Sequence, residues 1–130
     1  MTDTNGFRAY ESAIIGGMLA SGEHTLGSIR AEFRNIRKTA RLFSGGVSDT
    51  YYPIGSTWEE THFAGECLWL FLSEPRSLAN AMAHLLALGF SEPVARYAYR
   101  YLLDSKKPGG NVLTMTEVDG VPVLQRETKP

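Results

Sequence analysis

The stretch RSLANAMAHLLALGFSEPVARYAYRYLLDSKKPGGNVLTMTEVDGVPVLQR, residues 76–126, decides the fold of this 130-residue chain. Two segments with apolar residues at helical spacing flank Gly89-Phe90-Ser91-Glu92-Pro93, which predicts two helices joined by a tight turn. Asp119-Gly120 lies between two Val-rich runs and supplies the positive φ angles of a two-residue hairpin turn. Pro122 predicts that the second strand of this hairpin lies at a sheet edge. A helix-turn-helix followed by a hairpin is the element order of a winged helix.

The rest of the chain predicts three more helices. Residues 6–20 carry Phe7, Tyr10, Ile14 and Met18 at helical spacing, and a second helix ends at Phe43 with a stripe of Ile29, Phe33, Ile36, Ala40 and Phe43. Gly16-Gly17 either ends the first helix early or admits another backbone. A third helix opens at the capping box Ser56-Thr57-Trp58-Glu59.

Helix start signals also occur in the decisive stretch. Ser-Glu-Pro stands at 73–75 and at 91–93, where Ser can cap a helix and Pro fits its first turn. The fourth helix uses Leu78, Met82, Leu85 and Leu86, and Ala79, Ala83 and Ala87 form a small face suited to a close neighbour.

Composition and length indicate one mainly α domain, residues 1–130, with five helices around one core, a C-terminal hairpin, and flexible tails at 1–5 and 127–130. The longest apolar run, Cys67 to Leu72, is far shorter than the roughly 20 residues of a membrane span. Cys67 has no second cysteine to pair with, and its apolar neighbours indicate a buried thiol. We expect a cytoplasmic protein without a membrane partner.

The turn at Gly89 matches the bacterial helix-turn-helix pattern, in which a glycine is followed by an apolar residue and then by a cap. Leu85 and Ala95 depart from that pattern, where Ala and a β-branched residue are usual. In this interpretation, Arg96, Tyr97 and Arg100 project toward DNA. The alternative is an antiparallel helix pair that packs into the core, with these side chains merely solvent-exposed on its outer face.

The same residues resemble part of a ubiquitin-associated domain, through Leu88-Gly89-Phe90, Ala95 and Ala98, and through Gly110-Asn111-Val112. That family has a third helix after the Gly-Asn-Val segment. Here LTMTEVDGVPVL predicts a hairpin, so the resemblance implies little about ubiquitin binding.

A stripe of arginines follows the second helix: Arg30, Arg34, Arg37 and Arg41 stand at i, i+4, i+7 and i+11, with Lys38 beside them. Guanidinium groups suit phosphates or an acidic partner. Reversing the charge of Arg34 and Arg37 is then expected to abolish binding and leave the fold intact. The alternative is a solvated flank, paired with the acids of residues 59–74.

Signals for catalysis are weak. Glu59, His62 and Glu66 share a helix face, and Glu-x-x-His is the metal-binding unit of di-metal bundles, but such sites need a second copy and further carboxylates. There is no Gly-x-Ser-x-Gly and no P-loop. We therefore expect no cofactor, no metal and no catalytic residues, and an enzyme or metal protein is the third and least favoured functional class.

Two functions follow from these patterns. One is a DNA-binding, winged-helix-like regulator that uses the basic helix and the helix-turn-helix, with a homodimer as one assembly. The alternative is a small inhibitor or adaptor whose arginine stripe docks on an acidic protein surface.

Overall fold

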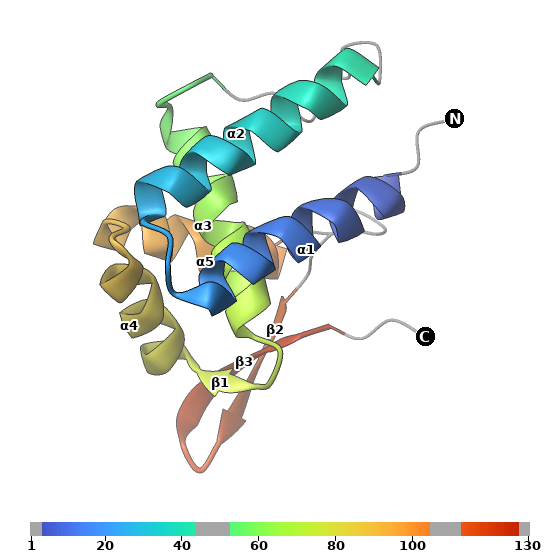
Figure 1. Ribbon diagram of the computed structural model, residues 1–130. Helices are drawn as coiled ribbons and strands as arrows, with labels where there is room; N and C mark the ends of the chain where they lie inside the picture. Colours follow the sequence, from blue (N-terminus) through green and yellow to red (C-terminus); the bar gives the residue numbers. More distant parts are fainter. Residues whose placement is uncertain (1–3, 44–52, 105–112, 128–130) are drawn as a thin grey trace. The chain divides into compact units, whose positions relative to one another are not determined.

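The computed structural model describes residues 4–43, 53–104 and 113–127, with side chains for 10–39, 53–103 and 113–127. The elements in order are α1 (Thr4–Ser21), α2 (Leu26–Phe43), α3 (Thr57–Phe71), β1 (Arg76–Ser77), α4 (Leu78–Leu88), α5 (Glu92–Asp104), β2 (Leu113–Val118) and β3 (Val121–Arg126) (Figure 1). This confirms a mainly α chain with five helices and a C-terminal hairpin. The short strand β1 is an addition that the sequence pattern did not predict.

Packing divides the chain into two compact units, residues 1–59 and residues 60–130. The first unit holds α1, α2 and the start of α3, and the second holds the remaining elements. The single domain with one core expected from the chain length stays a prediction. The predicted tails mostly fall on residues 1–3 and 128–130, outside the described residues, although α1 already begins at Thr4. Across the described ranges, every helix is too short or too polar to span a bilayer.

In the first unit, α1 and α2 pack against each other and are joined by a short turn at Gly22, whose φ is +68° (Figure 1). Thr25 caps α2, because its Oγ1 accepts a hydrogen bond from the Ser28 N–H at 3.1 Å. Ile29, Phe33 and Ile36 are buried, which confirms the described part of the predicted apolar stripe.

The buried face of α1 differs from the predicted one. Glu11 and Ile15 are buried, whereas Tyr10 is exposed and Ile14 only half-buried. The apolar periodicity misplaced this face by about one residue, because it could not count a carboxylate as a core group. Gly17 neither ends the helix nor admits a neighbour: α1 continues to Ser21, and nothing lies within 4 Å of a Cβ at Gly17.

The start of α3 uses the predicted capping residues. Ser56 Oγ accepts a hydrogen bond from the Glu59 N–H at 3.2 Å. The Glu59 carboxylate turns back to accept from the Gly55 N–H at 2.9 Å, one residue before the usual capping-box partner. Gly55 has a φ of +81°, in the left-handed region that glycine adopts readily.

The helix-turn-helix in the second unit consists of α4 and α5. Gly89, at φ 116°, ends α4 in the left-handed conformation, and its N–H bonds to the carbonyls of the preceding turn. Ser91 caps α5 by accepting from the Val94 N–H at 3.4 Å, as predicted. The corresponding prediction for Ser73 is wrong, because α4 begins three residues after Pro75 and is capped by Ser77.

The core of this unit lies among α3, α4, α5 and the sheet. Phe63 of α3 packs edge-on against Phe90, with ring centroids 5.3 Å apart. The buried apolar side chains are Phe63, Ala64, Cys67, Leu68, Leu72, Ala81, Leu85, Phe90, Ala95, Ala98, Leu102, Leu113 and Leu124. Cys67 is buried as expected. The predicted small face of α4 is wrong, since Ala79, Ala83 and Ala87 are exposed and α4 packs through Ala81 and Leu85 instead.

The sheet is antiparallel with strand order β1-β3-β2. Asp119 and Gly120 have φ angles of 53° and 78°, which confirms the predicted hairpin turn. The edge position predicted for β3 is wrong: β3 is central, and Pro122 is tolerated because the two residues of β1 pair only with Val123 and Leu124. Strands occupy the place of the third helix of a ubiquitin-associated domain, so the described residues do not complete that fold.

Candidate functional site

The outer face of α5 brings together the three side chains predicted from the helix-turn-helix pattern. Ala95, Ala98 and Leu102 face the core, so the intervening positions face solvent. Arg96, Tyr97 and Arg100 are all exposed. Arg96 and Arg100 stand one helical turn apart, and Tyr97 lies beside them.

A carboxylate shares this face. Glu92, the first residue of α5, forms an i,i+4 ion pair with Arg96, and both side chains remain about half exposed, at 60% and 47%. Glu92 was not among the predicted site residues, although its four-residue spacing from Arg96 is a signal for such a pair.

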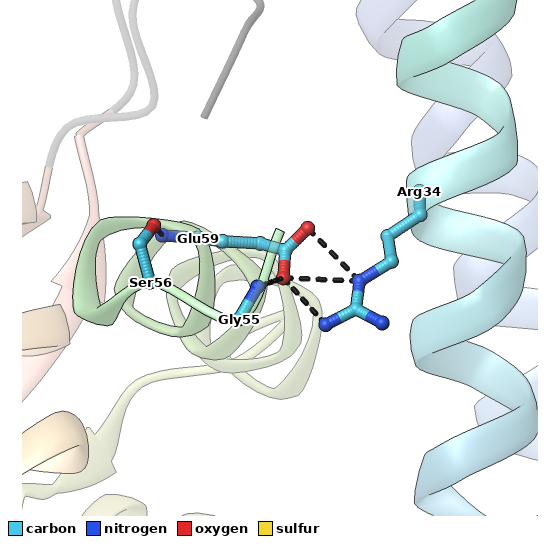
Figure 2. A network of polar contacts seen from close by, with 4 residues as sticks. All are labelled: Arg34, Gly55, Ser56 and Glu59. Atoms are coloured by element: carbon cyan, nitrogen blue, oxygen red, sulfur yellow. Dashed lines mark hydrogen bonds and ion pairs between the residues drawn. The ribbon is translucent and has the colours of Figure 1, made fainter. Parts of the chain in front are cut away.

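Arg34, from the predicted arginine stripe, belongs to a buried network in the first unit (Figure 2). Its Nε lies 3.0 and 2.9 Å from the two carboxylate oxygens of Glu59, and its Nη2 lies 2.6 Å from Oε1. The Glu59 side chain is only 5% exposed, against 33% for Arg34. A two-pronged pair with this geometry holds α2 to the first turn of α3.

This network sets the protonation of Glu59. Burial alone would raise the pKa of its carboxyl group. Two influences outweigh burial and lower that pKa below its ordinary value of 4.5: the hydrogen bonds from Arg34 and the Gly55 N–H, and the positive charges of Arg34 and Arg30. Glu59 is therefore held as a carboxylate, in a structural role.

Arg37 pairs with Glu11 of α1. Its Nη2 donates to Glu11 Oε1 at 3.0 Å, and its Nε lies 3.0 Å from Oε2 as an ion pair. The two side chains are 18% and 2% exposed. Its guanidinium also lies over the Phe33 ring, 4.6 Å from the centroid. Charge reversal at Arg34 or Arg37 would place a carboxylate beside a buried carboxylate, so the expectation of an undisturbed fold does not hold for these two positions.

The other members of the stripe differ in environment. Lys38 is exposed and Arg30 is half-buried. Arg41 lies in the last turn of α2, and its side chain is outside the described part. The stripe thus lies in the first unit, with two of its arginines bound to buried acids, whereas the α5 face belongs to the second unit.

Two of the three α3 residues with metal-ligand spacing, Glu59, His62 and Glu66, make other contacts. Glu59 binds Arg34, and the His62 ring packs edge-on against Tyr101 with centroids 4.8 Å apart. Across the described residues, no three His, Cys, Asp or Glu side chains are grouped as metal ligands.

The hairpin presents a different surface from α5. Met115, Val118 and Val121 are exposed, next to the acidic side chains of Glu117 and Asp119. No lysine or arginine occurs between Leu113 and Gln125. The arginines in the described part of the second unit are Arg96 and Arg100, exposed on α5, and Arg76 and Arg126, half-buried at the ends of β1 and β3.

Arg126 and Trp69 form a contact that the sequence did not suggest. Arg126 Nε donates to the Trp69 carbonyl at 2.8 Å, and the guanidinium lies over the indole ring, 4.7 Å from its centroid. This contact fastens the end of β3 to α3.

We compared the chain with protein-family models, with curated proteins and with solved structures, and none of them matches it.

Proposed function

We propose that this protein binds double-stranded DNA, with α5 as the recognition helix of a winged-helix-like unit. The elements from α3 to β3 follow the order helix, strand, helix, helix, strand, strand, and the sheet order is β1-β3-β2. This order of elements and strands is similar to that of winged-helix proteins, which supports the proposal. In such proteins the second helix of the helix-turn-helix enters the major groove.

The observation that carries the proposal is the outward face of α5. Its exposed side chains include two arginines one turn apart and a tyrosine between them. Arginine donates to guanine edges and to phosphates, and tyrosine contacts sugars and thymine methyl groups.

Each side chain has a distinct role in this proposal. Arg96 lies nearer the N-terminus of α5, where recognition helices contact base edges, and reads bases. Arg100 lies one turn further along and binds a phosphate. Arg34 and Arg37 are committed to buried carboxylates and take no direct part.

Salt dependence tests the class of function. Fluorescence anisotropy with random duplex DNA at low salt should show binding that weakens as salt rises, because bound phosphates release counterions. Arg100→Gln should lower the log–log slope by about one. Lys38→Gln removes the same charge from an exposed site on α2 and should leave the slope unchanged. A folded sample that binds no duplex at micromolar concentration would refute the proposal.

The alternative is an inhibitor or adaptor that docks on an acidic protein. Such a protein would also use cationic side chains, so a competition assay is needed to distinguish it from a DNA-binding protein. If α5 reads base edges, poly-glutamate should displace DNA from the protein only weakly, because it offers negative charge but no bases for α5 to contact. Equal affinity for poly-glutamate and for duplex DNA would favour the adaptor. A homodimer would present two copies of α5 to half-sites about 34–36 Å apart, which a two-site duplex can test.

A further inference from the structure

We infer that Glu92 and Arg96 act together as a reader of one G·C base pair, an inference that rests on the proposed DNA binding by α5. The two side chains are joined by an ion pair at the N-terminal end of the helix and are both about half exposed. This end of a recognition helix contacts base edges.

A carboxylate on this face needs an explanation. Glu92, Arg96 and Arg100 follow one another at four-residue intervals, so the carboxylate lies on the same stripe as the proposed DNA contacts. A carboxylate facing duplex DNA is repelled by phosphates unless it is neutralised or finds a donor. Arg96 neutralises the carboxylate, and the lone pairs that Arg96 leaves open can accept a hydrogen bond from a donor on a base.

The chemistry of the major groove identifies that base. A carboxylate only accepts hydrogen bonds, and the cytosine N4 amino group is the donor that Glu and Asp typically contact. Arginine only donates, and guanine offers two adjacent acceptors, O6 and N7, that fit its fork.

A G·C pair presents these groups side by side across its major-groove edge, two acceptors on guanine followed by a donor on cytosine. The Glu92–Arg96 pair presents the complementary order, donors followed by an acceptor. Because the two groups are already paired, they would approach the base pair together.

The hairpin supplies a matched control. Glu117 is an exposed acid in the same unit, on β2 and not on α5. Glu92→Gln and Glu117→Gln change the net charge equally, so neither differs from the other in its effect on the overall charge of the protein. Only Glu92→Gln should alter which base is preferred.

The experiment begins with selection of sites by the wild-type chain from a randomised duplex library. Anisotropy then compares the selected site with duplexes in which each G·C pair is exchanged. The wild type should discriminate at one G·C pair by about tenfold or more, within the range of a good base contact. Glu92→Gln should lose that preference and gain affinity for adenine, which an amide recognises. Arg96→Ala should lose the preference for guanine at the same pair.

The outcomes separate the two proposals. If the chain binds DNA but Glu92→Gln keeps the wild-type preference, or Glu117→Gln changes it equally, Glu92 is only a helix-stabilising residue and this inference falls while DNA binding stands. If a folded wild-type chain binds no duplex, both proposals fall. Matching circular dichroism spectra and melting temperatures for the variants show that the fold is retained.

Discussion

Replacing Arg34 by Met should destabilise the protein, because it leaves the Glu59 carboxylate buried without its main counter-charge. Removing one partner of a fully buried ion pair costs about 3–5 kcal/mol. Here a third of the Arg34 side chain is open to solvent, and Glu59 keeps its hydrogen bond from the Gly55 N–H. We therefore expect the free energy of unfolding to fall by about 2–3 kcal/mol at neutral pH.

The pH dependence of this loss gives a second readout. The pKa of Glu59 is lower in the folded protein than its ordinary value of 4.5, so the network stabilises the fold above that pH and the stabilisation is lost as the pH falls through the folded pKa. In Arg34→Met, burial is no longer opposed by Arg34 and the pKa of Glu59 rises. The difference in unfolding free energy between wild type and variant should therefore shrink as the pH falls from about 7 to about 3.

Urea denaturation followed by circular dichroism measures both effects. Lys38→Met removes an exposed cation from the same helix and should change stability by less than about 0.5 kcal/mol. The double variant with Glu59→Gln should recover part of the loss, since no buried charge then lacks a partner. If Arg34→Met proves as mild as Lys38→Met, or its loss does not vary with pH, the reasoning about a buried carboxylate is refuted.

Further substitutions test other parts of the fold. Gly17→Ala should raise the free energy of unfolding by about 0.5–1 kcal/mol in thermal or urea melts, because the position is helical and a Cβ meets nothing within 4 Å. Gly120→Ala should lower it by about 1 kcal/mol, since its φ of +78° strains any residue with a Cβ. Burial and the charge of Arg76 lower the pKa of His84 below 6.5, so the neutral imidazole stabilises the fold above that pH and this stabilisation is lost as the pH falls through the folded pKa. An NMR titration should find the lowered pKa. In His84→Phe, the free energy of unfolding should vary less between about pH 7 and 5. Arg126→Met should speed amide exchange in β3 if its stacking on Trp69 anchors the strand.

Local patterns predicted much of the fold. Period-3.6 spacing located α2, Ser56 and Ser91 marked helix starts, and Asp119-Gly120 marked the hairpin turn. Each of these signals acts within a few residues, so the sequence carries it without knowledge of the rest of the chain. β1 was missed because a two-residue strand has no periodicity and exists only through its pairing with β3.

Burial of polar groups could not be predicted in the same way. Glu11 occupies a core position of α1 because Arg37 neutralises it, and neither residue signals the other across the intervening loop. A hydrophobic pattern assigns such a carboxylate to the solvent side and shifts the predicted face of the helix accordingly. The error on α1 and the misjudged availability of Arg37 therefore have one cause, an ion pair between distant residues.

Buried ion pairs also decide whether the arginines of α2 or those of α5 are the better candidates for contacting DNA. On α2 and on α5, arginines recur at helical spacing, and spacing alone ranks the longer stripe on α2 higher. The ion-pair partners of these arginines reverse this ranking. Arg34 and Arg37 are bound to acids that are only 5% and 2% exposed. If either arginine turned to DNA instead, a buried carboxylate would lose its counter-charge. The partner of Arg96 is an acid that is itself exposed to water, so contact of this pair with a base strands no buried charge. Arginines on α5 can therefore engage a ligand without weakening the fold, which is why the proposed function is assigned to the shorter of the two stripes.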